Sequence, residues 1–280
     1  MTNKEHFKAV LGLIEIELFS YCNRKCWFCP NSTIDRLSTN IVMEESDYLD
    51  ILSQLKQIRF SKEVTFSRYN EPLSKRELFI KRLSQARDYL PNAILRTNTN
   101  GDFVTKDYIH ELYNNGLNQL WIQQYLSNNE KFNYKKLKKI INKKIKKLNL
   151  DYTVITDIPD VKIEYNIHYK DMTIHIRSRN FDVDGSSRGD VVPIAKDYQR
   201  TKKCNQPWNN MYIDYNGNIM VCCALRSDVS QHYNGIMGHI KDGYLWDIYM
   251  NDKYKPWRVH HSSDGIKKGV CKTCRDGIFK

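Results

Sequence analysis

The sequence of 280 residues has no apolar run close to the roughly 18–20 residues that a membrane-spanning helix requires. Its first twenty residues mix charges with short apolar stretches, which is not the pattern of a secretory signal. Internal repeats are absent, and the only low-complexity stretch is rich in lysine. We therefore exclude a membrane-spanning or secreted protein and expect a cytoplasmic one. A chain of this length buries enough surface to fold without disulfides, as one large domain or a domain with an appendage.

The net charge of +12 comes mostly from residues 135–147, which hold eight lysines and no acid, so the rest of the chain carries only +4. Apolar residues recur among these lysines at helical spacing, which predicts an amphipathic helix with lysines on its outer face. A surface for nucleic acid or for an acidic partner is one interpretation. No aromatic residues interleave with the lysines as base stacking requires, so we favour a solvated helix face and expect no nucleic acid or membrane partner.

Eight cysteines that stay reduced indicate metal binding or catalysis rather than disulfides. Three of them, Cys22, Cys26 and Cys29, lie within eight residues directly after the first predicted strand. Thiolates select zinc, copper or iron–sulfur clusters. A structural zinc site needs four ligands, and no fourth cysteine lies within 170 residues. Three ligands on a four-iron cluster would leave one iron open to bind another group. We predict a metal site at these cysteines rather than three buried thiols.

The other five cysteines lie in the last 77 residues: Cys204, Cys222, Cys223, Cys271 and Cys274. Four cysteines that include a Cys-x-x-Cys pair hold either zinc or a fully ligated cluster, and the spacing alone does not decide between them. We expect a strand over residues 219–223. In a strand, the neighbours Cys222 and Cys223 would face opposite sides, so only one of them would be a ligand.

The first 160 residues alternate between predicted strands and amphipathic helices. We expect strands at 13–18, 63–67, 93–97, 119–123 and 152–156, and helices at 43–58, 74–89, 105–115 and 134–149. Ser74 and Glu77 form a predicted capping box that starts the second helix. The alternation predicts an α/β fold with parallel strands, either a doubly wound sheet or a barrel, and a site beyond the carboxyl ends of its strands.

The pattern changes after residue 160. Two further strands are expected at 161–169 and 172–177, followed by a loop rich in Gly, Ser and Asp at 182–190. Weaker periodicity and most of the cysteines follow this loop. We therefore place a domain boundary near residue 185, which divides the chain into 1–185 and 186–280.

The spacing Cys-x3-Cys-x2-Cys, with Phe28 before the last cysteine, resembles the signature of the radical S-adenosylmethionine (radical SAM) enzymes. The resemblance implies a partial (β/α)6 barrel and a [4Fe–4S] cluster whose open iron binds S-adenosylmethionine. A 5′-deoxyadenosyl radical then abstracts hydrogen from the substrate, while the protein supplies orientation and excludes water. The expected cofactor contacts are Phe28, Glu71, Asn98 and Gln123. Glu71-Pro72 matches the end of the family's Gly-Gly-Glu-Pro segment, although Tyr69 and Asn70 replace its glycines.

The spacing of Cys204, Gly217 and Cys222 followed by Cys271-x-x-Cys274 resembles the SPASM/Twitch extensions of these enzymes. Only six residues follow Cys274, so the resemblance implies the Twitch version with one auxiliary [4Fe–4S] cluster. Its ligands would be Cys204, Cys222, Cys271 and Cys274. The glycine spacing selects Cys222 and leaves Cys223 as a packed thiol.

The layout is similar to family members that oxidise a secondary alcohol of an aminocyclitol. The resemblance implies oxidation or epimerisation of a small sugar- or cyclitol-like molecule, with an electron donor such as flavodoxin or ferredoxin. Arg177 is the candidate group that orients the substrate hydroxyl or accepts its proton; the alternative is a surface or salt-bridged arginine.

Two other functions remain open. The first is a maturase that modifies a ribosomally made peptide. Such enzymes usually carry a module for leader recognition, for which about twelve residues before the first strand leave no room. The second is a non-catalytic zinc or nucleic-acid-binding module, which would leave the three-cysteine loop and Glu71 unexplained. The sequence does not name the substrate.

Overall fold

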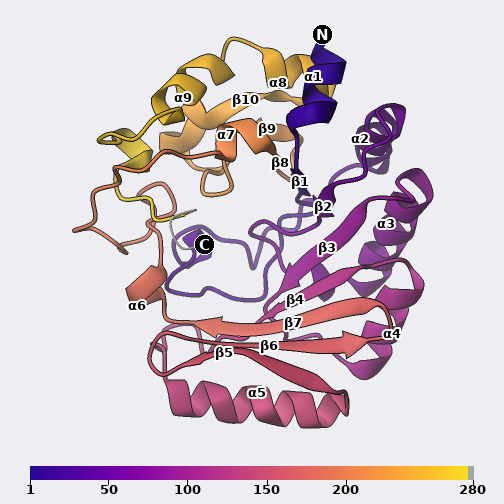
Figure 1. Ribbon diagram of the computed structural model, residues 1–280, viewed down its shortest axis with the longest axis vertical. Helices are drawn as coiled ribbons and strands as arrows, with labels where there is room; N and C mark the ends of the chain where they lie inside the picture. Colours follow the sequence, from indigo (N-terminus) through magenta and orange to yellow (C-terminus); the bar gives the residue numbers. More distant parts are fainter. Residues whose placement is uncertain (277–280) are drawn as a thin grey trace.

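The computed structural model describes residues 1–276, and its core is one ten-stranded sheet (Figure 1). The strand order is β10-β9-β8-β1-β2-β3-β4-β7-β6-β5. The six strands from β8 to β7 are parallel to one another, whereas the two strands at each end of the sheet are antiparallel. The predicted α/β fold with a partial barrel of parallel strands is confirmed.

The parallel strands are β1 (Leu13–Ile16), β2 (Glu63–Thr65), β3 (Ile94–Thr99), β4 (Gln119–Gln123), β7 (Met172–Arg179) and β8 (Asn210–Ile213). The antiparallel strands are β5 (Tyr152–Ile158), β6 (Lys162–Tyr169), β9 (Asn218–Met220) and β10 (Ile236–His239). The helices are α1 (Asn3–Val10), α2 (Glu45–Gln57), α3 (Arg76–Tyr89), α4 (Lys106–Asn114), α5 (Tyr134–Leu148), α6 (Phe181–Asp184), α7 (Gln206–Asn209), α8 (Leu245–Met250) and α9 (Tyr254–His261). Short 3₁₀ turns include η1 (Pro30–Ser32), η2 (Pro72–Ser74), η3 (Ser230–Gly235), η4 (Ile240–Asp242) and η5 (Gly269–Cys271).

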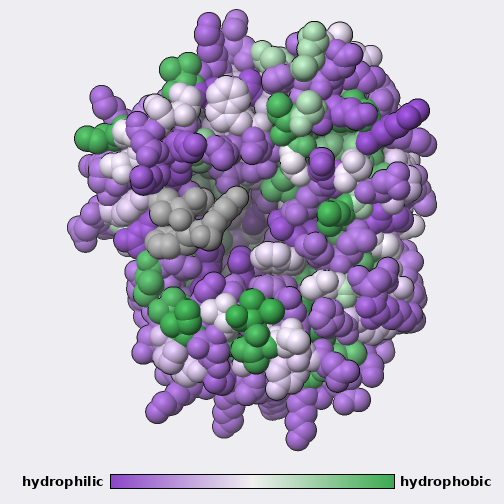
Figure 2. Space-filling view, viewed as in Figure 1, coloured by the Kyte–Doolittle hydropathy of each residue, from purple (hydrophilic) through white to green (hydrophobic). Residues whose placement is uncertain are grey.

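Helices α2 to α5 cover the outer face of the sheet, and the last part of the chain closes one side of it (Figure 1). The core forms between these layers because each strand and helix buries an apolar face there, as Ile14, Leu95, Leu120 and Ile174 do without exposure. Each such side chain contributes about 1.5–3 kcal/mol when it is removed from water. The surface in view is mostly hydrophilic (Figure 2). Within residues 1–276 we find no helix that combines the length and the apolar character needed to cross a membrane.

The predicted lysine-rich helix is confirmed as α5. Its apolar face packs against the sheet through Leu137, Ile141, Ile145 and Leu148, which are nearly fully buried. Asn133 caps the first turn by accepting from the backbone N–H of Lys136, and Asn149 ends the helix in the left-handed conformation.

The expectation that residues 152–156 continue the parallel series is wrong. This segment is β5, an edge strand that pairs antiparallel with β6. The connection between the two strands is a tight turn around Asp160, which has a positive φ. Such a short connection permits only antiparallel pairing, because a parallel neighbour requires a long crossover.

The predicted capping box of Ser74 and Glu77 is also wrong. Helix α3 begins at Arg76 after Lys75, which makes no side-chain cap, and Ser74 is the last residue of the turn η2. Glu71 caps that turn instead, since its carboxylate accepts from the Leu73 N–H, and Pro72 occupies the first position of the turn. Ser74 Oγ donates to the Glu71 carbonyl.

The last 90 residues join the sheet directly, because β8 pairs in parallel with β1. The proposed boundary at residue 185 stays a prediction. The strand expected over 219–223 ends at Met220, and Cys222 and Cys223 lie in the turn that follows. The argument that a strand separates these two side chains is therefore wrong.

Candidate active site

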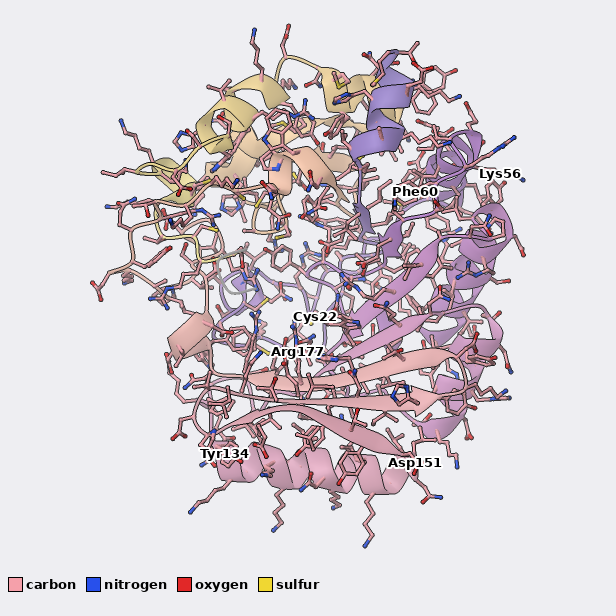
Figure 3. All side chains as sticks on the ribbon, viewed as in Figure 1. Cys22, Lys56, Phe60, Tyr134, Asp151 and Arg177 are labelled. Atoms are coloured by element: carbon pink, nitrogen blue, oxygen red, sulfur yellow. The ribbon has the colours of Figure 1, made fainter. Side chains whose placement is uncertain are left out.

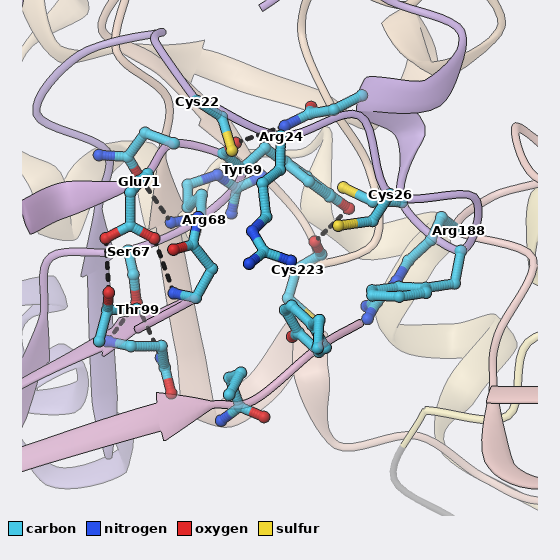
Figure 4. A pocket seen from close by; sticks show the side chains of 18 of the residues that line it. Cys22, Arg24, Cys26, Ser67, Arg68, Tyr69, Glu71, Thr99, Arg188 and Cys223 are labelled. Atoms are coloured by element: carbon cyan, nitrogen blue, oxygen red, sulfur yellow. Dashed lines mark hydrogen bonds between the residues drawn. The ribbon is translucent and has the colours of Figure 1, made fainter. Parts of the chain in front are cut away.

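A cavity of about 250 Å³ lies at the carboxyl ends of the parallel strands, where the loops of an α/β sheet place ligands (Figure 4). Its walls come from the loop after β1, the ends of β2, β3, β4 and β7, the loop at 186–190 and the turn after β9. Cys22 and Arg177 both lie near this central hollow, whereas Tyr134 and Asp151 mark the distant ends of α5 (Figure 3). The structure thus brings together side chains from most of the chain.

Cys22, Cys26 and Cys29 line one side of the cavity. Burial raises the pKa of Cys22 and of Cys26 to about 12, and it also raises that of Cys29. The charge of the Cys29 thiolate is a further cause for both Cys22 and Cys26. The three sulfurs therefore lie near one another on one wall of the cavity, with Cys22 and Cys26 buried and Cys29 half-buried.

Arg24 holds this cysteine loop in place. Its Nε and Nη2 donate to the Asp102 carboxylate at 2.7 and 2.5 Å, and its Nη1 donates to the Leu126 carbonyl at 2.8 Å. Asn128 fixes the following residues, because its Oδ1 accepts from the N–H of Lys25 and its carbonyl accepts from that of Trp27. Loops after β3 and β4 thus determine where the cysteines stand.

Glu71 lies almost fully buried near Cys22, because its N–H donates to the carbonyl of the adjacent Tyr21 at 2.9 Å. Its carboxylate accepts from Thr99 Oγ1 at 2.6 Å, from the Asn100 N–H at 2.7 Å and from the Leu73 N–H at 3.1 Å. Burial raises its pKa to about 7, against the opposing effect of these hydrogen bonds. A carboxylate whose charge is incompletely compensated is a suitable partner for the ammonium group of a ligand.

Three further predicted residues also line the cavity. Asn98 Nδ2 donates to Ser67 Oγ at 2.7 Å. Gln123 Oε1 accepts from Arg177 Nε at 2.7 Å, and Gln123 Nε2 is buried without a partner within residues 1–276. No carboxylate of that part of the chain lies within 4.0 Å of the Arg177 guanidinium, so the salt-bridged alternative is not observed. The catalytic role of Arg177 remains a prediction.

Phe28 belongs to an aromatic wall. Its ring stacks on that of Phe181 with centroids 3.7 Å apart, and it lies tilted against Tyr125 at 4.8 Å. All three rings line the cavity. The Phe28 ring therefore shapes this wall of the cavity and keeps water out of the space that it fills.

Sequence reasoning missed Arg24, Arg188 and Cys223 as parts of this site. Arg188 lies in the loop at 182–190, in a left-handed conformation, with its Nη1 3.6 Å from Asp276. Cys223 was expected to be packed; its half-buried side chain does pack against the core, and it also lines the cavity (Figure 4). The glycines of the segment that contains Arg188 were visible in the sequence, but the sequence does not indicate that this segment folds over the cysteine loop.

The second cysteine set also comes together. Burial raises the pKa of Cys271 and Cys274 to about 12, and the pKa values of Cys204 and Cys222 are raised as well. A hydrogen bond with Cys223 is the largest cause of the raised pKa of Cys222, followed by burial and by the charges of Cys223, Cys274 and Cys204. The assignment of Cys222 as the ligand stays a prediction.

Nitrogen atoms surround the sulfurs of this second set. Arg200 Nη1 lies 3.6 Å from Cys274 Sγ, His261 Nε2 lies 3.4 Å from Cys271 Sγ, and the Ala224 N–H donates to Cys222 Sγ at 3.2 Å. Donors aimed at sulfur stabilise thiolates and tune a cluster that they bind.

The cysteines supply the donor type that an iron–sulfur cluster requires. Thiolates that hold a four-iron cluster each bind a different iron. Cys22, Cys26 and Cys29 would therefore leave one iron without a protein ligand, whereas four cysteines of the second set would bind all four irons.

Residues 16–165 match the family profile of the radical SAM superfamily, which covers more than half of the chain. The chain belongs to the radical SAM superfamily. Residues 204–275 match the profile of the SPASM iron–sulfur cluster-binding domain.

Known proteins with similar sequence and structure span nearly the whole of this radical SAM chain. The S-adenosyl-L-methionine-dependent 2-deoxy-scyllo-inosamine dehydrogenase of Niallia circulans is 26% identical over 271 residues, covering 95% of this chain and 94% of that protein. The crystal structure of BtrN with AdoMet and 2-DOIA superposes with a TM-score of 0.65 at 22% identity, over 95% and 92% of the two chains. The structure of anSMEcpe with bound AdoMet gives a TM-score of 0.50 at 13% identity, over 88% and 79%.

The protein is therefore a radical SAM enzyme of the oxidoreductase type. Its predicted cofactors are confirmed: S-adenosylmethionine with a [4Fe–4S] cluster, and an auxiliary iron–sulfur cluster in the SPASM domain. These findings do not favour the zinc or nucleic-acid module or the peptide maturase.

Proposed function

We propose that this radical SAM enzyme oxidises a secondary alcohol of a small, cyclitol-like molecule to a ketone. The dehydrogenase of Niallia circulans, whose name gives 2-deoxy-scyllo-inosamine as its substrate, matches this chain over almost the full length of both proteins. The polar lining of the cavity supports the same class of substrate, because each hydroxyl of such a molecule requires a hydrogen-bond partner when it leaves water.

The position of Arg177 carries the proposal. Its guanidinium reaches the cavity from the end of β7, and within residues 1–276 only its Nε is bonded to a side chain, that of Gln123. The other N–H groups of a planar guanidinium remain available to an oxygen atom. Burial lowers the pKa of Arg177, and the charge of Arg179 adds to this effect, so a substrate oxygen that accepts from Arg177 relieves an uncompensated charge.

When bound, S-adenosylmethionine and its cluster supply the removal of one hydrogen atom from carbon, and the auxiliary cluster supplies an electron acceptor. An alcohol becomes a ketone when it loses one hydrogen atom, one electron and one proton. In our proposal Arg177 donates to the hydroxyl oxygen, which stabilises the negative charge that develops there as the proton leaves to water at the cavity mouth. Phe28, Tyr125 and Phe181 keep water away from the reacting carbon.

Cysteine and glutamate side chains of the cavity would hold the cofactor. We propose that Cys22, Cys26 and Cys29 bind the open cluster and that Glu71 binds the ammonium group of S-adenosylmethionine, with Asn98 at its polar edge. Cys204, Cys222, Cys271 and Cys274 would bind one auxiliary cluster. Each turnover that starts by reductive cleavage consumes an electron, which we assign to a small carrier such as flavodoxin or ferredoxin.

Anaerobic assays with a panel of cyclitols and aminocyclitols, including 2-deoxy-scyllo-inosamine, test this function. We expect one substrate to increase the formation of 5′-deoxyadenosine, to yield a ketone, and to transfer deuterium from its carbinol carbon to 5′-deoxyadenosine. The variant in which Cys22, Cys26 and Cys29 are all alanine should produce none. If no polyol of the panel stimulates cleavage, or if the deuterium stays in the substrate, the proposed reaction is wrong.

Two variants of Arg177 isolate its role. Arg177→Lys keeps the charge but loses the planar fork, and Arg177→Gln keeps polar donors without charge. A group that stabilises a developing oxyanion should lower kcat by about 10²-fold or more in Arg177→Gln, with a smaller effect on KM. A rise in KM alone would reduce Arg177 to a binding residue.

The Cys223 thiol favours epimerisation as a second candidate reaction. In this reaction a substrate carbon that has lost a hydrogen atom receives another from the opposite face. The thiol of Cys223 lines the cavity, and its weak S–H bond makes it a suitable hydrogen-atom donor. The sulfur radical left behind then takes up one electron from the auxiliary cluster and one proton from water. In deuterium oxide, epimerisation would place deuterium on the product carbon, and Cys223→Ser would abolish this product while any ketone formation continued.

A further inference from the structure

The lysines of α5 form two adjacent rows with different surroundings. Lys136, Ile140 and Lys144 follow at four-residue intervals and face the cysteine loop: Lys136 and Ile140 line a groove there, and Lys144 Nζ donates to the Gly101 carbonyl. Residues three positions apart are neighbours on a helix, so the row next to it consists of Lys139, Lys143 and Lys147. We call these three residues the outer lysine row.

The outer lysine row is exposed and has no acidic partner. Its three side chains form no ion pair within 4.0 Å among residues 1–276. On α5, only Lys136 and Lys138 pair with acids, Glu130 and Asp157. The nitrogen-tipped side chains of α5 extend away from the sheet (Figure 3). Helix α5 therefore carries an excess of positive charge that the fold itself does not use.

A groove of about 460 Å³ connects this helix with the cysteine loop. Its lining includes Arg24 and Asn128 on the loop side and Lys136 and Ile140 on α5. Arg24 also lines the active-site cavity, and Asn128 Oδ1 lies 4.0 Å from Cys26 Sγ. One layer of side chains thus separates the groove beside α5 from the site of the open cluster.

Further cations lie along the same loop. The Lys131 Nζ lies 3.4 Å from the centroid of the Trp27 ring, and the half-exposed Lys25 precedes Trp27 by two residues. Each of these cations has an acidic partner: Arg24 with Asp102, Lys131 with Asp182 and Lys25 with Asp35. The uncompensated positive charge near the cysteine loop therefore lies on α5, in the outer lysine row.

We propose that this surface docks an acidic protein that carries one electron, and that the carrier delivers this electron to the cluster held by Cys22, Cys26 and Cys29. The inference rests on the proposed function, which requires such an electron. In the transfer the reduced carrier loses one electron and the cluster gains it, and no covalent bond changes. Charge complementarity selects an acidic partner, and the groove places it next to Cys26. A nucleic acid is less suitable, because the aromatic rings near these lysines, Tyr134 and Trp27, already lie under Lys138 and Lys131.

The test compares two charge-matched variants of the holoenzyme. In the first, Lys139, Lys143 and Lys147 are all replaced by glutamate. In the second, the exposed residues Lys8, Lys253 and Lys255 on α1 and near the start of α9, at the other end of the molecule, are replaced in the same way (Figure 1). The probe is a bacterial flavodoxin in its reduced form. Its dissociation constant is measured by fluorescence anisotropy, and its oxidation by the enzyme by stopped-flow absorbance.

We expect the α5 variant to weaken flavodoxin binding and to slow its oxidation by about 10-fold or more at low ionic strength, since electrostatic steering contributes factors of about 10 to 10³. Raising the salt concentration should shrink this difference, and the control variant should behave like the unmodified enzyme. Dithionite, a small reductant that needs no docking surface, should drive the same 5′-deoxyadenosine formation in all three proteins, which also shows that the variants are folded.

Equal flavodoxin rates in the α5 variant and the unmodified enzyme would overturn the proposal. So would a slower rate in the control variant alone, which would place docking near the second cysteine set. If a single-stranded oligonucleotide binds the outer lysine row while flavodoxin oxidation is unaffected by its charge reversal, the surface serves nucleic acid and the proposal is wrong. Loss of cleavage with dithionite in the unmodified enzyme would instead refute the proposed function.

Discussion

The bidentate salt bridge between Arg24 and Asp102 should stabilise the cysteine loop far more than an exposed ion pair with equally short distances would. Two charge-assisted hydrogen bonds join the side chains, which are 17% and 32% exposed. Burial alone would raise the pKa of Asp102, but the hydrogen bonds and charge of Arg24 lower it overall. The interaction should therefore be lost as the pH falls below about 3.8, the ordinary pKa of an aspartate.

The magnitude follows from the number and the exposure of the hydrogen bonds. A bond to a charged partner contributes about 1.5–3 kcal/mol when it is shielded, and an exposed pair about 0.2–1 kcal/mol in total. For two bonds at intermediate exposure we expect a coupling free energy of about 2 kcal/mol. Arg24→Ala alone should cost about 3 kcal/mol, because the bond to the Leu126 carbonyl is lost as well.

Native-state hydrogen exchange of the anaerobic holoenzyme measures this coupling. Amides in the cysteine loop report the free energy of local opening, and the double-mutant cycle of Arg24→Ala and Asp102→Ala isolates the pairwise part. A coupling of about 2 kcal/mol corresponds to an exchange difference of about 30-fold. The matched control is the cycle of Arg76 and Glu111, whose 2.6 Å pair is 51% and 36% exposed. If both cycles give the same coupling, burial is not the deciding factor and the reasoning is refuted.

Three further outcomes follow from the structure. His261→Phe removes the imidazole nitrogen that lies beside the Cys271 sulfur. This change should lower the midpoint potential of the auxiliary cluster in a redox titration followed by electron paramagnetic resonance, whereas His260→Phe should not. Burial lowers the pKa of His232, so thermal unfolding should occur at lower temperature as the pH falls below about 6.5, and His232→Gln should reduce this dependence. Gly217→Ala, at φ +82° with an imidazole nitrogen 2.6 Å from the added Cβ, should lower the urea midpoint more than Gly12→Ala, whose added Cβ meets only the Asn209 carbonyl oxygen at 3.6 Å.

The elements that were predicted well are those whose pattern is local and strong. Helix α5 was expected at 134–149 and spans Tyr134–Leu148, and β4 was expected with its observed bounds, Gln119–Gln123. In α5 apolar residues recur among lysines at helical spacing, and β4 is a short apolar run, Leu120–Ile122, between two glutamines, so both are visible in the sequence itself. The start of α3 was missed because Glu71, a residue of the site, caps the preceding turn in place of Ser74.

The site was predictable where a motif carries it. Cys22, Cys26 and Cys29 stand close together in the sequence, so their meeting in space needs no long-range information. Arg24 lies within the same loop, but its partner Asp102 is 78 residues away and gives no sign of this pairing. Arg188 and Cys223 were missed for the same reason, because they reach the cavity only after β8 has paired with β1 and carried the second half of the chain beside the first.

The residue that departs most from the family pattern explains how the two halves are held together. Tyr69 stands where the family has a glycine, and its phenol oxygen donates to the carbonyls of Cys223 at 3.0 Å and of Ala224 at 3.1 Å. The Arg226 guanidinium lies 4.7 Å from its ring centroid. The Tyr69 side chain, two residues before Glu71, therefore holds the turn that contains Cys222 and Cys223. A glycine could not form these bonds, so Tyr69 adds a contact to those that Arg68 makes with Asp214 and the Leu225 carbonyl between the two halves of the chain.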